Sequence, residues 1–115
     1  MSFSILRVSG DRDENGSVFE DSTELLDSIS GWNDLLLYIS RENGILRIKY
    51  IEDRSDPSNV FDIETINPEF YPKLCSYIDV ELSRNIDHCK RENLLKLKML
   101  MHMQSNKYTY LELSY

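Results

Sequence analysis

The sequence predicts an α+β fold: a two-layer sandwich in which a mainly antiparallel sheet of about five strands is covered on one face by one long and one short helix. Three observations lead to this prediction. Residues 3–9 and 60–66 alternate apolar with polar side chains, as half-buried strands do. Residues 72–91 repeat apolar side chains every three or four positions, as amphipathic helices do. Beyond residue 94 the apolar period shortens to two, which favours a further strand.

The length and composition are typical of a folded protein with one hydrophobic core. The 115 residues fit a single domain over 1–115, and 41% of them are hydrophobic. No stretch reaches the roughly 18 uncharged apolar residues of a membrane span, and the N-terminal apolar run is too short for a signal peptide. We therefore expect a cytoplasmic protein. Its two cysteines, Cys75 and Cys89, should be free thiols about 20 Å apart on one helix.

The first part of the chain predicts a strand followed by a short helix. The strand covers about residues 3–9 and ends at a glycine and an acidic loop. The helix covers about residues 22–30. It has acids and hydroxyls at its start, Leu25 and Ile29 four residues apart, and Gly31 just after its end.

Residues 32–43 fit two structures. Helical spacing of apolar residues runs straight through Gly31, so one longer helix that ends at Asn43 is an open alternative. Asn43-Gly44 is a strong hairpin signal because both residues tolerate a positive φ. A hairpin about this turn places Ile39 opposite Ile48 and separates an apolar from a polar face. The sequence favours the hairpin.

The second half predicts a short strand, a long helix and a terminal hairpin. The strand covers residues 60–66, with a sheet edge as one position open to it, and the helix covers about residues 72–91. A helix continued through residue 104 would be roughly 50 Å long, which is out of scale for a domain of this size. We therefore expect a strand over about 94–103, paired with 107–115.

The register of this terminal hairpin follows from burial. If Gln104-Ser105-Asn106 forms a three-residue loop, Met99 lies opposite Leu111 and the apolar residues of both strands share one face.

The sequence contains no recognisable catalytic, metal or cofactor motif. His88 and Cys89 are adjacent, but consecutive helix positions point about 100° apart and cannot form a nucleophile and base. There is no CxxC or HxxxH pair, and the four glycines are scattered through turns and do not form a phosphate loop. We therefore expect no enzyme activity, no catalytic residues, no metal site and no cofactor.

The charge of the chain is its most informative feature. The net charge is −7, and residues 1–31 carry seven acids against two arginines. Such a balance repels phosphate backbones and anionic membranes and attracts a basic protein. A solvated loop and a helix start also account for these acids. As partner-binding residues the sequence suggests the acids of two loops and one exposed aromatic: Asp11, Asp13, Glu14, Glu20, Asp21, Glu24, Asp27, Trp32, Glu52, Asp53 and Asp56.

The function that these features favour is a non-enzymatic acidic inhibitor of a basic protein. A toxin-immunity protein that neutralises a nuclease-type toxin is the most concrete example, with carboxylates in the positions of substrate phosphates. The alternative is a self-associating structural or adaptor module that uses an edge strand or the C-terminal hairpin. The sequence leaves open whether the protein is a monomer or a homodimer.

Overall fold

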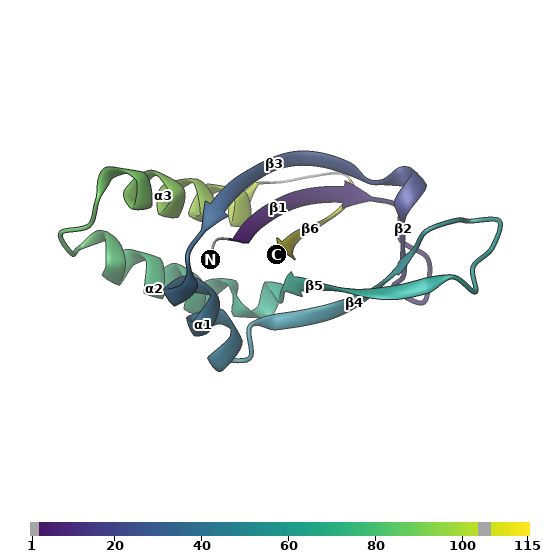
Figure 1. The fold of residues 1–115 in the computed structure, drawn as a ribbon, viewed down its shortest axis with the longest axis horizontal. Helices are drawn as coiled ribbons and strands as arrows, with labels where there is room; N and C mark the ends of the chain where they lie inside the picture. The colour runs from purple at the N-terminus through teal and green to yellow at the C-terminus, as the bar shows by residue number, and fades with distance from the viewer. Residues whose placement is uncertain (1–2, 104–106) are drawn as a thin grey trace.

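A computed structural model describes residues 3–103 and 107–115, and it confirms the α+β class. The described residues form a six-stranded mixed sheet and three α-helices (Figure 1). The strands are β1 Phe3–Gly10, β2 Val18–Phe19, β3 Glu24–Gly31, β4 Ile45–Ile51, β5 Val60–Ile66 and β6 Tyr108–Ser114. The helices are α1 Asn33–Arg41, α2 Tyr71–Leu82 and α3 His88–His102. Short 3-10 turns cover Glu20–Ser22 and Pro68–Phe70.

The sheet is strongly curved and has the strand order β2-β4-β5-β6-β1-β3. β1 pairs antiparallel with β3 on one side and β6 on the other, and β4 pairs antiparallel with β5. Only the short β2–β4 pairing is parallel among the described strands. Figure 1 shows β1, β3 and β6 on one side of the curve and β4 and β5 on the other, with the helices gathered at one end.

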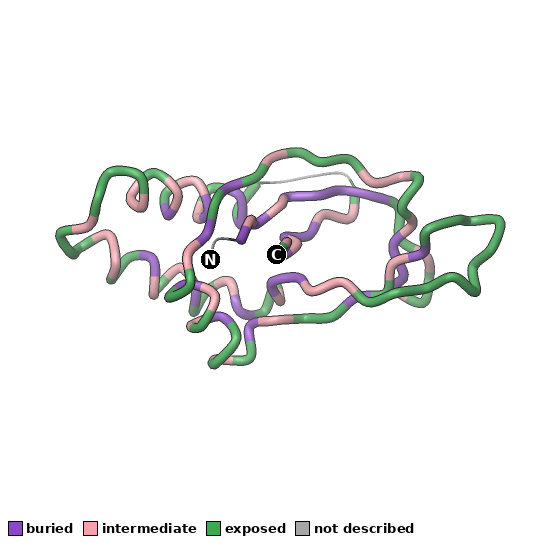
Figure 2. The backbone as a smooth tube through the Cα atoms, in the orientation of Figure 1, coloured by how far each residue is buried: buried purple, intermediate pink, exposed green. Residues whose placement is uncertain are grey.

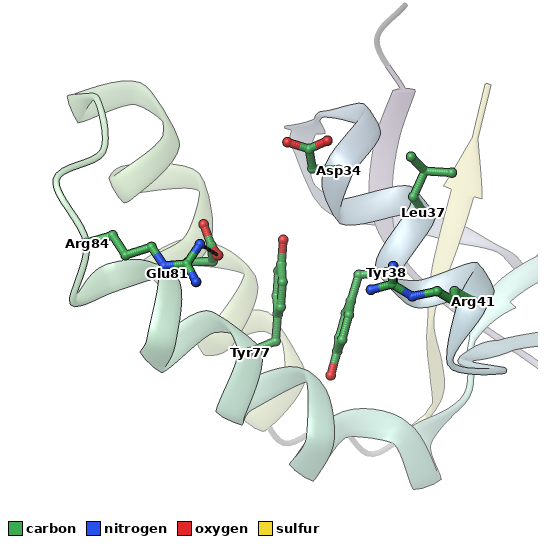
Figure 3. Close-up of a pocket in the computed structure, with 7 residues that line it drawn as sticks. All are labelled: Asp34, Leu37, Tyr38, Arg41, Tyr77, Glu81 and Arg84. Carbon is green, nitrogen blue, oxygen red and sulfur yellow. Dashed lines mark ion pairs between the residues drawn. The ribbon is translucent and has the colours of Figure 1, made fainter.

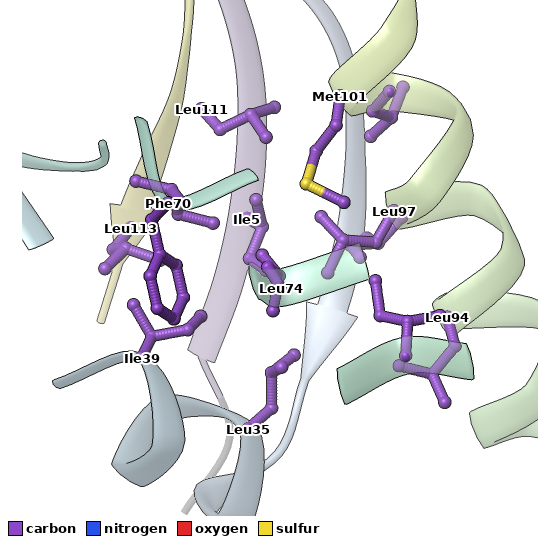
Figure 4. Close-up of a cluster of buried hydrophobic side chains, with 14 of the residues drawn as sticks. Ile5, Leu35, Ile39, Phe70, Leu74, Leu94, Leu97, Met101, Leu111 and Leu113 are labelled. Atoms are coloured by element: carbon purple, nitrogen blue, oxygen red, sulfur yellow. The ribbon is translucent and has the colours of Figure 1, made fainter. Parts of the chain in front are cut away.

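The main core lies between the helices and one face of β1, β3 and β6 (Figures 2 and 4). Ile5 of β1 sits opposite Ile29 of β3 and Leu113 of β6, so these three side chains share the face that the helices cover. The helices contribute Leu35, Ile39, Leu74, Ile78, Leu94, Leu97, Leu100 and Met101. These eleven buried side chains explain why three separate helices are held at one end of the sheet.

A second, smaller core fills the opposite face of the sheet. It contains Val8, Val18, Ile48 and Tyr110, and Val8 lies directly opposite Tyr110. Residues of β1 that alternate with Ile5 therefore point into a different cluster. β1 is buried on both faces.

The hairpin that the sequence favoured at Asn43-Gly44 is wrong, and so is a helix that continues through Gly31. α1 ends at Arg41, and Asn43 adopts a φ of 59°. The amide of Gly44 donates to the carbonyl of Ile39 at 2.7 Å, and that of Asn43 donates to Ser40 at 3.2 Å. These two bonds form a Schellman cap, so the residue pair that typifies a hairpin here ends a helix.

Position 44 requires glycine for a separate structural reason. A Cβ at this position would lie 2.5 Å from the Phe70 ring, and the Gly44 carbonyl accepts a hydrogen bond from the Asn67 amide at 2.8 Å. Only glycine lets the start of β4 approach the turn before α2 this closely.

The helix predicted over 72–91 is two helices. α2 ends at Leu82, and α3 begins after Asp87, whose Oδ1 accepts from the Lys90 amide at 2.9 Å as an N-cap. The break lets α3 fold back beside α2 (Figure 1). The chain therefore avoids the long rod that the sequence argument ruled out, without needing a strand over 94–103.

The strand predicted over 94–103 is wrong, because these residues belong to α3. Leu94, Leu97 and Met101 are buried at helical spacing, whereas Leu95 and Met99 are half exposed. The register that placed Met99 opposite Leu111 is also wrong. The second strand of that hairpin exists as β6, but it pairs with β1 and β5, and Leu111 lies opposite Arg7. The predicted loop at 104–106 lies outside the described residues.

The short helix predicted over 22–30 is also wrong, since β3 occupies this region as an edge strand. Of the two residues that suggested a helical face, Ile29 is buried but Leu25 is 59% exposed. Pairing along β1 outweighs local helical preference here. Strand predictions at 3–9 and 60–66 are confirmed by β1 and β5, although β5 lies inside the sheet.

No helix in the described ranges is both long enough and apolar enough to cross a membrane.

Alanine substitutions in α3 test its helical burial pattern. Leu97→Ala should lower the free energy of unfolding by about 2–5 kcal/mol, because it leaves a cavity in the main core. Leu95→Ala should change it by less than about 0.5 kcal/mol, because that side chain is half exposed. Urea unfolding followed by circular dichroism measures both. Equal losses would support a strand, in which the two side chains share one face.

Substitutions at Asn43 test the cap of α1. Asn43→Gly should preserve stability, whereas Asn43→Val should lower it by about 1–2 kcal/mol because a β-branched residue disfavours a positive φ. Thermal unfolding of the two variants beside the unsubstituted protein gives the comparison. A fully stable Asn43→Val protein would contradict the left-handed conformation.

Candidate functional site

The two acidic loops of the sequence come together at the end of the sheet that lies away from the helices (Figure 1). Residues 11–23 connect β1 to β3 through β2, Glu24 begins β3, and residues 52–56 begin the connection from β4 to β5. The parallel pairing of β2 with β4 sets Val18 beside Tyr50, which brings the loops alongside each other. We call residues 11–24 and 52–56 the acidic end.

Arg54 joins the two loops of the acidic end. Its Nη2 lies 2.7 Å from Oδ2 of Asp11, and its Nε lies 2.8 Å from Oδ1 of Asp21. The guanidinium also lies over the Phe19 ring, 4.4 Å from its centroid. The hydrogen bonds that Arg54 donates, first to Asp21 and then to Asp11, raise the pKa of Arg54 above its usual value. One cation thus holds carboxylates from one loop against the tip of the other.

Other carboxylates hold the turns of these loops. Oδ1 of Asp13 accepts from the amides of Asn15 and Ser17 at 2.9 and 2.8 Å. Oδ1 of Asp53 accepts from the Ser55 hydroxyl and amide, and these bonds lower the pKa of Asp53. Such Asx turns fix loop shape without any contribution from the core.

The acidic end holds the whole charge excess of the molecule. It contains nine carboxylates and two arginines, a balance equal to the net charge of −7 for the full chain. All other acids and bases therefore cancel. The Glu14, Glu20 and Glu24 carboxylates are exposed and form no ion pair within the described ranges. Their potential is directed into solvent.

Apolar side chains adjoin the acidic end. At the start of β5, Val60 is 40% exposed and Phe61 is 43% exposed. The Phe61 ring packs edge-on against Tyr50, with centroids 5.0 Å apart, and the Tyr50 hydroxyl lies 3.2 Å from Thr23 Oγ1. Carboxylates next to a held aromatic ring provide the charged and apolar parts of a protein-binding surface.

Two of the residues that the sequence suggested for this surface lie elsewhere. Asp27 is in the middle of β3 and pairs with Lys96 of α3 at 2.7 Å, which lowers the pKa of Asp27. Trp32 precedes α1, packs against the main core, and has the Lys90 ammonium 5.6 Å from its ring centroid. Asp27 thus attaches α3 to the sheet, and Trp32 adds to the packing of the main core. The other nine suggested residues lie within the acidic end.

Sequence reasoning missed Arg54, Val60 and Phe61. The signal for Arg54 was its position as the single base among the acids of residues 52–59. Phe61 was assigned to a strand, but nothing in the sequence indicated which face of that strand would be exposed to solvent.

A separate groove lies between α1 and α2, with a volume of about 320 Å³ (Figure 3). The Tyr38 and Tyr77 rings stack at its centre, 4.1 Å apart and nearly parallel. Its lining charges balance: Asp34, Arg41, Glu81 and Arg84. Glu81 and Arg84 pair at 3.1 Å. The stacked rings mainly hold α1 against α2.

The histidines and cysteines are arranged differently from the sequence expectation. His88 pairs with Glu92 at 3.0 Å, and Cys89 is exposed. The two cysteines are free, but they lie on different helices. Sγ of Cys75 on α2 lies 3.4 Å from Nε2 of His102 on α3, a contact that sequence reasoning missed. Burial raises the pKa of the Cys75 thiol.

Comparisons with known proteins add no assignment: no family model, no curated protein and no solved structure matches this chain. Within residues 3–103 and 107–115, no group of three or more histidine, cysteine, aspartate or glutamate side chains is placed to hold a metal ion.

Removing Arg54 tests whether it organises the acidic end. Arg54→Ala should speed amide hydrogen exchange in residues 11–22 and 52–59 and leave exchange in the helices unchanged, because its two ion pairs join those loops only. Arg84→Ala is the matched control, since it removes an exposed arginine paired on α2. Unchanged exchange at the acidic end would show that the turns alone hold the loops.

Proposed function

We propose that this protein is a non-enzymatic binding protein that caps a basic protein partner with its acidic end, in the manner of an immunity protein that neutralises a nuclease-type toxin. The observation that carries the proposal is that one end of the fold holds the entire net charge of −7. The same acids could simply be solvated loop residues, but that explanation does not require two separate segments to bring their negative charge to one end of the fold.

Preorganisation supports this proposal. Arg54 and the turn-forming aspartates hold the loops before any partner binds, so little loop entropy is lost on association. The exposed Glu14, Glu20 and Glu24 carboxylates remain available to cations of a partner. They would lie where the phosphates of a nucleic acid substrate lie against the lysines and arginines of a nuclease.

Phe61 supplies the apolar contact that such an interface needs. Charge accelerates association and selects the partner, whereas a buried aromatic ring slows dissociation. Phe61 is exposed, held by Tyr50, and adjacent to the loop of residues 52–59. We therefore assign it the role of anchor at the centre of the bound surface.

The alternative function is self-association through an edge strand. β3 ends the sheet order and exposes Leu25 and Leu26 by 59% and 38%. The other version of this alternative used a C-terminal hairpin as the interface, but residues 88–102 are helical and do not form the first strand of that hairpin.

Neutralising three carboxylates tests the proposed function. Glu14→Gln, Glu20→Gln and Glu24→Gln together should weaken partner binding by about tenfold or more, with most of the loss in the association rate, because steering depends on the charge concentrated at the binding surface. The matched control neutralises three exposed acids on or beside the helices: Asp34→Asn, Glu69→Gln and Glu92→Gln. It should bind as the unsubstituted protein does.

The measurement has two stages. Cross-linking in a cell lysate identifies the protein that the unsubstituted chain and the control capture and the triple Gln variant loses. That protein, purified, is then titrated calorimetrically at low and high salt and assayed for nuclease activity. A partner with an acidic surface, a salt-independent affinity, or equal loss in both triple variants contradicts the proposal.

A further inference from the structure

The contact between Cys75 and His102 is the one place where a thiol and an imidazole meet in the described structure. Sγ of Cys75 lies 3.4 Å from Nε2 of His102. Cys75 is partly buried on α2, and His102 is exposed in the last turn of α3. The proposed function uses neither residue.

The geometry of this pair matches one edge of a tetrahedral zinc site. With a Zn–S bond of about 2.3 Å and a Zn–N bond of about 2.0 Å, the tetrahedral angle sets sulfur and nitrogen about 3.5 Å apart. The observed separation differs from this edge by about 0.1 Å. A single zinc ion can therefore bond to both atoms with almost no movement of either helix.

The helices are already fixed in this arrangement. One turn earlier on α3, Nζ of Lys98 lies 2.7 Å from Oδ1 of Asp79, which is one turn later on α2. Packing of Leu74 and Leu97 in the main core holds the same two helices from the other side. The pair is thus preorganised, which is the usual requirement for tight metal binding.

Two ligands are half of what tetrahedral zinc requires. Within the described ranges, no third histidine, cysteine, aspartate or glutamate joins the pair. His102 is exposed, so solvent reaches the imidazole of the pair. A second identical pair, brought up by a two-fold rotation, would complete a site of two cysteines and two histidines, a common structural zinc set.

The surface beside the pair favours a second copy as the occupant. Leu95 and Met99 precede His102 by seven and three residues, so all three lie on one exposed side of α3. Leu95 is 51% exposed and Met99 is 53% exposed. A two-fold contact around His102 would cover this apolar stripe with its own counterpart.

We propose that Cys75 and His102 form half of a zinc site, and that a second copy of this chain completes it. As each Zn–S bond forms, the Cys75 thiol loses its proton to buffer, and neutral His102 binds through the lone pair of Nε2. The resulting dimer is joined through α2 and α3, away from the acidic end, so each copy still presents that end to a partner (Figure 1).

Zinc titration of the full chain tests this inference. Zinc chloride added to the reduced protein should bind at one ion per two chains by calorimetry, and sedimentation should show a monomer that becomes a dimer. Cobalt(II) in place of zinc should give the visible absorption of a tetrahedral thiolate site. Cys75→Ser and His102→Gln should each abolish both binding and dimerisation.

Cys89→Ser is the matched control, because Cys89 is the other free and exposed thiol. It should bind zinc and dimerise as the unsubstituted protein does. Thermal unfolding without zinc confirms that each variant folds, and His102→Ala serves if His102→Gln does not. The inference is overturned if zinc binds one ion per monomer, which would indicate a site within one chain, or if Cys75→Ser retains binding.

Discussion

The rest of the fold depends on β1, because this strand needs backbone hydrogen bonds along both edges and side-chain packing on both faces. Its backbone pairs with β3 and with β6, and its side chains supply both cores: Ile5 points to the helices and Val8 to the smaller cluster. Between them Arg7 is 4% exposed and donates to the Met103 carbonyl at the C-terminal end of α3. This cation meets the negative end of the helix dipole. Its Nε has no hydrogen-bond partner among the described residues.

Strands were easier to predict from the sequence than helices, and the reason lies in the composition of residues 93–103. Seven of the eleven residues there are leucine or methionine, so the helical set Leu94, Leu97 and Met101 coexists with an alternating set. The choice between the two is made by tertiary contacts with α2, such as Lys98 with Asp79. The same holds in reverse for β3, where pairing along β1 overrides a helical pattern. Neither the contacts between α3 and α2 nor the pairing of β3 with β1 can be inferred from the local sequence.

The candidate surface was predictable in composition but not in architecture. Acids in two loops are visible in the sequence, and nine of the eleven suggested residues lie within one end of the fold. What joins the loops is the parallel pairing of Val18 with Tyr50 and the position of Arg54, and both depend on contacts between residues more than thirty apart. Asp27 was assigned by charge alone, yet its carboxylate is occupied by Lys96.

The pairing of β1 with β6 also constrains how the molecule forms. Ser4 lies opposite Ser114, so the central strand finds one of its two neighbours roughly a hundred residues later in the chain. During synthesis β1 can pair with β3 early, but its other edge stays open until β6 has left the ribosome. Contacts this distant in sequence slow folding and prolong the exposure of apolar strand edges. The early β1–β3 hairpin is thus the species most in need of protection from aggregation.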